Sequence, residues 1–456
     1  AEDIIKEAAG YQTLSNAAHG VAHVLEQLLE AAGYEIVSFE EKADVYVINT
    51  CSVTNVADKK SRQMLHRAKK MNPSAVVVAA GCYVQAAAEE LKKDLSVDVI
   101  IGNNKKQDLV PILESYFQEL DGRGADGGSA ADGRPTEDRD HVIDISKTHE
   151  YESLSIRKIS DHTRAFLKVQ DGCNQFCSYC IIPYTRGRVR SRRPEDVEAE
   201  VRTLVAGGYQ EVVLTGIHLS SYGVDFPVDQ AEDLLGLIKR LHAVEGLKRI
   251  RLGSLEPRII TAEFAGELAA MEKICPHFHL SLQSGCDATL KRMNRHYDTR
   301  DYEERCKILR RAFDNPAITT DVIVGFPGET EEEFEQTREF LERIRFYEMH
   351  IFKYSRRAGT RADSMPDQVP ESVKSIRSDV LLELEKQMSE DYRRSLVGKA
   401  KTVLLEEKIT LDGTDYMIGH TKEYVKAVVP YRDGLKNTIA EGTLAGMATD
   451  EILYLS

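Results

Sequence analysis

The stretch that decides the fold is Asp171-Gly172-Cys173-Asn174-Gln175-Phe176-Cys177-Ser178-Tyr179-Cys180, which follows directly on an apolar run. Its three cysteines have the spacing C-x3-C-x2-C, and no further cysteine or histidine follows within the next 30 residues. Three thiolates this close together can bind a metal ion or an iron–sulfur cluster, but they cannot all pair with one another as disulfides. A four-iron cluster held by three cysteines leaves one iron without a protein ligand, and an open position is where chemistry takes place. The loop is therefore predicted to bind a redox cofactor with an open position, and a structural zinc knuckle is the alternative.

Composition and charge exclude several classes of protein. The 456 residues, of which 42% are hydrophobic and 29% charged, predict a globular protein of about two to four domains. The sequence contains no run of 18 apolar residues, so no membrane span is expected. The first 20 residues lack the pattern of a secretory signal. Eight cysteines without such a signal favour a reducing compartment and metal binding rather than disulfides. The net charge of -14 argues against a protein that coats nucleic acid non-specifically, while it leaves room for a local basic patch.

Residues 17–118 have the pattern of an α/β domain, which is placed at 1–120. Apolar strands are expected at 45–48, 75–80 and 97–101, with helical periodicity before and between them. This alternation predicts a doubly wound parallel sheet with helices on both faces, whose ligands bind beyond the carboxyl ends of the strands. Cys51 and Cys82 each lie just past a predicted strand, so both are expected at that edge. A linker is expected at 121–160, because residues 121–140 are rich in glycine and acids.

The residues beyond the linker predict two more domains. Strands are expected at 165–170, 211–215, 249–254, 277–282, 318–325 and 349–354, and a helical pattern follows each of the first five. This repeat predicts a partial (β/α)6 barrel at 161–395, with the active site at the C-terminal strand ends, where the cysteine loop lies. A charged helix is expected at 377–396. Short strands at 402–405, 416–419, 425–429 and 452–454 then predict a small antiparallel β-barrel at 396–456.

The cysteine loop and its barrel context resemble the radical S-adenosylmethionine (SAM) superfamily. In that family the open iron of a [4Fe-4S] cluster binds the amino and carboxylate groups of SAM, and the reduced cluster cleaves SAM to a 5′-deoxyadenosyl radical. The resemblance implies that Cys173, Cys177 and Cys180 hold the cluster and that Tyr179 packs on the adenine. Arg295 could pair with a carboxylate of the cofactor or be a solvated helix charge. The resemblance implies further SAM contacts for residues that could otherwise be ordinary turn or strand-end residues: Thr215, Gly216, Ser254, Glu256, Gln283, Ser284, Gly325 and Pro327.

Two N-terminal stretches resemble the methylthiotransferases, namely YVINTCSVTN at 46–55 and Gly81-Cys82-Tyr83. That family has the same order of an α/β domain, a radical SAM barrel and a small C-terminal barrel called TRAM. Its N-terminal domain supplies three cysteines to a second, auxiliary [4Fe-4S] cluster, so the resemblance assigns Cys51 and Cys82 to that cluster. The position of the other cysteine falls near Ser15, where this chain has none. Either this copy is altered, or residues 1–20, which begin without methionine, depart from the native sequence. As written, two thiolates remain for the auxiliary cluster, and Ser15 or His19 could substitute for the other.

Residues 54–63, TNVADKKSRQ, resemble the branch of this family that acts on threonylcarbamoyladenosine in tRNA. The resemblance implies an enzyme that adds sulfur and a methyl group at carbon 2 of this nucleoside, beside the anticodon. One SAM would methylate a sulfur at the auxiliary cluster, and a second SAM would yield the radical for C–S bond formation. The partners would be the tRNA anticodon stem-loop and an electron donor such as a flavodoxin, and the enzyme would be a cytoplasmic monomer. Two alternatives stay open: a methylthiotransferase that acts on a ribosomal protein, and a zinc-binding and RNA-binding protein without catalysis.

The strongest basic run, RGRVRSRR at 186–193, follows the cysteine loop. Its five arginines at a barrel mouth predict phosphate binding, although a charge run is usually a solvated face. From residue 396 on, 7 Lys and Arg stand against 9 Asp and Glu, so charge does not favour RNA binding by the C-terminal barrel. The tyrosines of that barrel, Tyr416, Tyr424 and Tyr431, could stack on bases or simply pack. The remaining cysteines follow no ligand spacing and are expected in the core: Cys275, Cys286 and Cys306.

Overall fold

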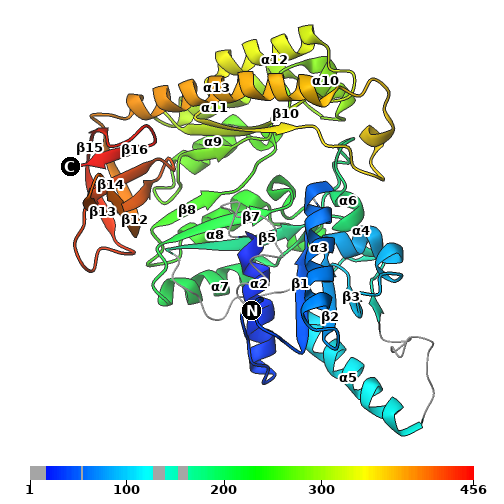
Figure 1. Ribbon diagram of the computed structural model, residues 1–456. Coiled ribbons are helices and arrows are strands. Elements are labelled where there is room, and N and C mark those ends of the chain that lie inside the picture. Colours follow the sequence, from blue (N-terminus) through cyan, green and yellow to red (C-terminus); the bar gives the residue numbers. More distant parts are fainter. Residues whose placement is uncertain (1–16, 53–54, 127–138, 153–162) are drawn as a thin grey trace.

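The computed structural model describes residues 17–52, 55–126, 139–152 and 163–456 (Figure 1). The expectations for Ser15, for the His19 side chain and for most of the linker lie outside the described residues. Among the helices that are described, none combines the length and the apolar character that crossing a membrane requires.

The N-terminal part is a parallel sheet with helices on both faces, as predicted. Its described strands run in the order β1-β2-β3-β4. They are β1 Val45–Thr50, β2 Val76–Gly81, β3 Val99–Ile101 and β4 Asp140–His141. Because successive strand residues point to opposite faces, Ile48 packs with the helices α3 (Asn55–Met71) and α4 (Cys82–Leu91), whereas Val47 packs with α2 (Ala17–Ala31) and α5 (Leu109–Asp126). The two faces of the sheet therefore have separate apolar cores.

Two details of this part differ from the expectation. Residues 121–126 were predicted to belong to the linker, but they continue α5, because a helix that has already formed adds residues at little cost. The short strand β4 was not expected, since two residues carry no periodicity; its Asp140 and His141 pair with Ile100 and Ile101 of β3.

The central part contains the six parallel strands that were predicted. Three of them, together with the antiparallel β6 (Arg190–Ser191), form one sheet, and the other three form a second sheet. The strands are β5 Arg164–Asp171, β7 Glu211–Gly216, β8 Arg249–Leu252, β9 His277–His279, β10 Ala317–Val324 and β11 Glu348–Lys353. A parallel bridge between Leu255 and Leu280 joins the two sheets beyond β8 and β9. The result is an open barrel of strands, in agreement with the expected partial (β/α)6 architecture (Figure 1).

Helices cover the outside of this barrel. They are α7 Pro194–Ala206, α8 Leu234–His242, α9 Ala262–Ala269, α10 Asp287–Arg292, α11 Thr299–Ala312 and α12 Glu331–Ile344. Four of them begin at a side chain that accepts a hydrogen bond from the first turn, which fixes their start: Asp233, Thr261, Asp298 and Thr330. The strand residues alternate accordingly. In β10, Ile318 and Val322 pack against the helices, so Thr319 and Asp321 face the barrel interior.

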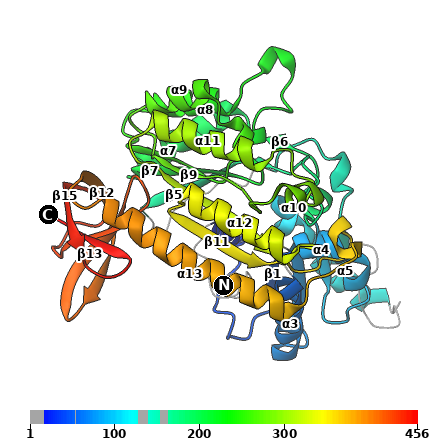
Figure 2. The same cartoon turned by 90° about the horizontal axis from the view of Figure 1, so that it is seen from above.

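A closed five-stranded barrel ends the chain, within a stretch that is described without gaps. Its strands are β12 Ala400–Leu411, β13 Thr414–Thr421, β14 Lys426–Pro430, β15 Ile439–Met447 and β16 Ile452–Leu455. The pairing is antiparallel except between β14 and β16, which are parallel. The sequence prediction missed β15, because its residues IAEGTLAGM include two glycines and bury only Leu444 fully. Helix α13 (Glu371–Ser395) runs along β11 and leads to this barrel (Figure 2).

The C-terminal barrel closes the amino-terminal end of the central barrel. Tyr424 lies between the guanidinium groups of Arg164 and Arg251, 4.9 and 4.7 Å from its ring centroid. His277, at the start of β9, lies 5.2 Å from the same ring. Of the two roles that the sequence left open for Tyr424, packing is the one that the structure bears out. The opposite end, at the carboxyl ends of the strands, is left for the cysteine loop.

Candidate iron–sulfur and SAM site

The cysteine loop leaves β5 through a turn that only glycine can make. Gly172 has φ +70°, and a Cβ there would lie 1.8 Å from the carbonyl oxygen of Arg188. The amide of Cys173 donates to the carbonyl of Gly187 at 3.0 Å, and the amide of Cys180 donates to the carbonyl of Cys177 at 3.0 Å. None of the described cysteines is in a disulfide. The three thiols of the loop are therefore held in one small volume and remain available as ligands.

The electrostatics of the loop suit a bound metal cluster. Burial, together with the negative charges of Cys177 and Cys173, raises the pKa of the Cys180 thiol to about 12. Burial likewise raises the pKa of Cys173. Thiols of this kind lose their protons when a metal binds, so the cluster itself supplies the positive charge that the thiolates need. The residues present fit a three-cysteine cluster.

Arg295 is the cation of this site. Its Nη1 donates to Cys177 Sγ at 3.2 Å, its Nε donates to Tyr297 Oη at 2.9 Å, and its Nη2 donates to the carbonyl of Ser281 at 3.3 Å. These contacts rule out the alternative of a solvated helix charge. Tyr179 lies nearby, with its ring 6.3 Å from that of Phe326 in a small apolar cluster.

Several of the predicted SAM contacts line the same end of the barrel. Ser254 Oγ and Ser281 Oγ lie 2.8 Å apart, and Glu256 accepts from Arg258 Nε at 2.7 Å. Thr215 Oγ1 donates to the carbonyl of Leu167 at 3.1 Å. A Cβ on Gly216 would lie 2.9 Å from Gln170 Oε1, so the backbone passes close to that side chain.

Three more of the predicted SAM contacts have partners elsewhere in the central barrel and its helices. The backbone of Gln283 has φ +75°, and its side chain hydrogen-bonds Asp321 inside the barrel. Ser284 Oγ instead lies 3.2 Å from Thr337 Oγ1 of α12. A Cβ on Gly325 would lie 2.3 Å from Lys374 Cγ of α13. These contacts place the Ser284 hydroxyl against α12 and Gly325 against Lys374 of α13.

Cys51 and Cys82 lie side by side at the edge of the N-terminal sheet. They directly follow Thr50 and Gly81, which are paired across β1 and β2. Cys82 Sγ accepts a hydrogen bond from Arg186 Nε at 3.0 Å and another from Asn103 Nδ2 at 3.5 Å. Two cysteines at neighbouring strand ends fit an auxiliary cluster in part. Cysteines 275, 286 and 306 are buried in the central barrel, as predicted.

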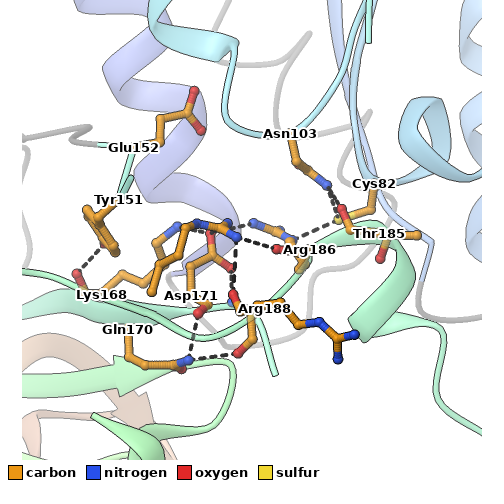
Figure 3. A network of polar contacts seen from close by, with 12 residues as sticks. Cys82, Asn103, Tyr151, Glu152, Lys168, Gln170, Asp171, Thr185, Arg186 and Arg188 are labelled. Carbon is orange, nitrogen blue, oxygen red and sulfur yellow. Dashed lines mark hydrogen bonds and ion pairs between the residues drawn. The ribbon is translucent and has the colours of Figure 1, made fainter. Parts of the chain in front are cut away.

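Arg186 links Cys82 to the start of the cysteine loop, a role that sequence reasoning missed. In Figure 3 it lies between Cys82 and Asp171, the residue with which the cysteine loop begins, and its Nη1 is 3.4 Å from Asp171 Oδ2. Lys168 Nζ also approaches that carboxylate, at 2.8 Å. Burial alone would raise the pKa of Asp171, but Lys168 and Arg186 hold it well below its usual range. Asp171 Oδ1 in turn accepts from the amide of Gly172 at 2.8 Å, so the network ends on the loop itself.

The basic run is only partly a surface feature. Arg190 and Arg192 are buried along with most of Arg186; Arg190 donates to the carbonyls of Arg186 and Arg188, and Arg192 pairs with Glu200. These three arginines are internal groups, so the prediction that the whole run binds phosphate is wrong for them. Phosphate binding remains a prediction for Arg188 and Arg193, whose side chains are exposed.

Arg188 belongs to an aromatic group beside the cysteine loop. Its guanidinium lies 4.7 Å from the ring centroid of Phe176, which packs edge-on against Tyr184 at 5.7 Å. The Tyr184 side chain is 56% exposed. Phe176, Tyr184 and Arg188, hereafter the aromatic group, therefore offer a flat and partly cationic surface next to the cysteines.

The stretch that indicated the substrate branch contacts the central barrel. Asp58 Oδ2 lies 2.6 Å from Nη1 of Arg357, and the same nitrogen donates to Asn55 Oδ1 at 3.2 Å. Asn55 Nδ2 donates to the carbonyl of Arg356 at 2.6 Å. Thr54 lies outside the described residues. The pattern at 55–58 thus docks the N-terminal sheet on the loop after β11.

Two family models match the chain. Residues 167–341 match the Radical SAM superfamily, and residues 17–102 match the Uncharacterized protein family UPF0004. The first match spans β5 to α12 and includes the cysteine loop, and the second spans the sheet that carries Cys51 and Cys82.

Curated relatives match over almost the whole chain. The threonylcarbamoyladenosine tRNA methylthiotransferase MtaB of Bacillus subtilis is 41% identical over 411 residues, which are 90% of this chain and 87% of that protein. The tRNA-2-methylthio-N(6)-dimethylallyladenosine synthase of Moorella thermoacetica is 37% identical over 90% of this chain and 89% of that protein. Among solved structures, the radical S-adenosylmethionine methyltransferase TsrM from Kitasatospora setae covers 75% of this chain and 73% of its own, with TM-score 0.54 and 18% identity. That likeness is one of fold.

Proposed function

Because the chain belongs to the radical SAM methylthiotransferase family, we propose that it converts N6-threonylcarbamoyladenosine, next to the anticodon of tRNA, to its 2-methylthio derivative. One observation carries the proposal: a single arginine contacts a cysteine of the N-terminal set and Asp171, the residue with which the cysteine loop begins. Cys173, Cys177 and Cys180 lie beyond β5, Cys51 and Cys82 lie beyond β1 and β2, and Arg186 contacts both Cys82 and Asp171. The MtaB relative of Bacillus subtilis supports the choice of nucleoside.

The chain's own residues bind and orient. The two [4Fe-4S] clusters and SAM supply, when bound, the radical and sulfur chemistry that no side chain can perform. Cys173, Cys177 and Cys180 hold one cluster, and Arg295 steadies it through its hydrogen bond to Cys177 Sγ. Cys51 and Cys82 supply two thiolate ligands to the other, auxiliary cluster.

SAM would lie against the residues at the same end of the barrel. Tyr179 offers its ring to the adenine, and the strand-end residues Thr215, Gly216, Ser254, Glu256 and Gln283 provide the polar contacts. Ser284 and Gly325 connect their strand ends to the outer helices, because Ser284 contacts Thr337 of α12 and Lys374 of α13 packs close to Gly325.

The aromatic group is the proposed contact for the anticodon loop. Bases of a single-stranded loop can be unstacked and placed on aromatic or guanidinium planes, which favours an exposed tyrosine backed by a phenylalanine and an arginine. Tyr184→Ala should weaken binding of an anticodon stem-loop about tenfold, because one stacked base contributes about 1–3 kcal/mol. Binding is measured by fluorescence anisotropy, with Tyr431→Ala, an exposed tyrosine of the C-terminal barrel, as the matched control. If only Tyr431→Ala weakens binding, the contact runs through the C-terminal barrel instead.

The reaction itself is tested with anaerobically reconstituted enzyme, SAM, a reductant and tRNA that carries threonylcarbamoyladenosine. Mass spectrometry of the digested nucleosides should show the 2-methylthio product. A parallel reaction with ribosomal protein should show none. Methylthiolation of the protein alone would refute the substrate assignment, and a preparation that holds zinc without iron or sulfide would refute the chemistry.

The remaining features of the proposal concern the setting of the enzyme. Thiolate ligands need a reducing compartment, which supports a cytoplasmic enzyme. The reaction needs single electrons, which supports an electron donor protein such as a flavodoxin. A monomer is proposed, because one chain carries both sets of cysteines.

A further inference from the structure

Three neighbouring strands place two histidines and one carboxylate together inside the central barrel. His279 ends β9, Asp321 lies in β10 and His350 lies in β11. The pairing of the strands sets them at nearly one level, because His279 pairs with Thr319 and His350 pairs with Asp321. One ligand atom from each of the three lies within 4.8 Å of the others. These residues are hereafter the lumen triad.

The position of the lumen triad separates it from the cysteine loop. Along the inward face of β9 and the turn after it, His277 contacts the Tyr424 ring, His279 belongs to the triad, and the carbonyl of Ser281 accepts from Arg295. The lumen triad therefore lies between the closed floor of the barrel and the cluster end. None of its members belongs to the sets of cysteines or to the predicted SAM contacts.

The geometry suits a divalent cation better than a simple ion pair. His279 Nε2 and Asp321 Oδ2 are 3.3 Å apart, which is long for a charge-assisted hydrogen bond. Two ligand atoms about 2.1 Å from an ion and 3.3 Å from each other subtend an angle of about 104°, close to tetrahedral. His350 is exposed to the lumen, and within the described residues no hydrogen bond fixes its ring. A rotation of that ring can bring its nitrogen into range.

Outer contacts already orient two of the ligands. His279 Nδ1 and Thr319 Oγ1 share a hydrogen bond of 3.0 Å, which holds the ring with Nε2 toward Asp321, where Nε2 can bind an ion once it has lost its proton. Gln283 hydrogen-bonds the Asp321 side chain, and burial, which alone would raise the pKa of Asp321, is outweighed by His279, so that the carboxylate stays ionised. Such outer partners are typical of metal-binding histidines and carboxylates.

We propose that His279, Asp321 and His350 bind one first-row divalent cation, such as Fe2+, Mn2+ or Zn2+, in the lumen of the barrel. Two histidines and one carboxylate on one side of an ion form a ligand set that these metals accept, and the open positions face the lumen. One carboxylate and two neutral imidazoles leave the bound ion with a net positive charge. The site is independent of the clusters and of the proposed tRNA reaction.

The test uses the reconstituted, desalted full chain and Mn2+ alone. Free Mn2+ is followed by its EPR signal during titration, which gives the stoichiometry and the dissociation constant. The wild-type chain should bind one Mn2+, and Asp321→Asn and His350→Ala should each weaken binding more than tenfold. Thr319→Val, which removes only the outer hydrogen bond, should weaken it about tenfold.

The matched control is His66→Ala, because His66 and Asp94 form a surface histidine–carboxylate pair at 2.8 Å. Its Mn2+ affinity should equal that of the wild type, and all variants should keep their iron and sulfide content. Equal Mn2+ binding in wild type and in Asp321→Asn would overturn the proposal. A wild-type chain that binds no Mn2+ at millimolar concentration would also overturn the proposal. If Asp321→Asn then still abolished tRNA modification, the lumen triad would hold substrate and not metal.

Discussion

The two sets of cysteines differ in how the chain assembles them. Cys173, Cys177 and Cys180 come from one loop, and the turn at Gly172 and the backbone contact to Gly187 suffice to gather them. Cys51 and Cys82 come from different strands, so they meet only because the register of β1 and β2 pairs Thr50 with Gly81. The first set is thus a local feature, and the second depends on tertiary structure.

The same contrast extends to the cations beside each set. Arg295 reaches Cys177 from the loop after α10 within the same barrel. Arg186 reaches Cys82 across the contact between the central barrel and the N-terminal sheet. The loop can therefore form its cluster alone, whereas the second site depends on how the two parts of the chain dock.

The largest effect is expected from removing a ligand of the loop. Cys177→Ala should abolish SAM cleavage and lower the iron content by about four per chain, because the open cluster needs all three thiolates. Formation of 5′-deoxyadenosine and iron are measured after anaerobic reconstitution. Cys306→Ala, which removes a buried thiol elsewhere in the barrel, serves as the control. Unchanged 5′-deoxyadenosine in the Cys177 variant would refute the role of the loop.

Removing a ligand of the second set should separate the two sites. Cys82→Ala should lose the methylthio product while it still cleaves SAM, since the loop lies on another element. Its iron content should fall from about eight to about four per chain if the second cluster forms in the wild type. A wild-type chain that already holds about four irons would show that Cys51 and Cys82 do not suffice.

Breaking the link between the sets should have a smaller effect. Arg186→Ala removes a partner of the buried Asp171 carboxylate, which should lower the free energy of unfolding by about 3 kcal/mol. It should also weaken the second cluster more than the first, because Arg186 contacts Cys82 directly. Urea denaturation and iron content are compared with those of Arg202→Ala, which removes an exposed arginine of α7. Equal loss of both clusters would mean that Arg186 supports the fold as a whole.

The sequence predicts the features that are made by residues close together in the chain, and it does not predict the contacts between residues far apart. The six parallel strands of the central barrel and the cysteine loop are legible because each is a continuous pattern of apolar or ligand residues. The strand β15 is not, since its glycines and alanines carry no alternation. Arg186 could not be assigned to Cys82, because the two are 104 residues apart and no local pattern links them. The branch pattern at 55–58 was legible as a resemblance, but its contact with Arg357 was not.

The smallest effect concerns the pH dependence of stability that arises from a buried basic side chain beside each set of cysteines, Lys106 and His218. Burial and the charge of Arg186 lower the pKa of Lys106 near Cys82, and burial and Arg295 lower the pKa of His218 to about 4 near the loop. His218 is ionised in the unfolded chain below its ordinary pKa but stays neutral in the folded chain until about pH 4, so protons favour unfolding as pH falls through that window. Between pH 7 and 4.5 this lowers the free energy of unfolding by about 2 kcal/mol.

His218→Asn should lose that part of the acid sensitivity, because asparagine does not titrate. Urea denaturation of the cluster-free chain at several pH values measures the difference between wild type and variant, and His66→Ala, at an exposed histidine, is the control. A variant whose stability falls as steeply as the wild type between pH 7 and 4.5 would show that His218 is already charged in the folded chain. Since Lys106 is present in both the wild type and the variant, its contribution cancels in the difference, which isolates His218.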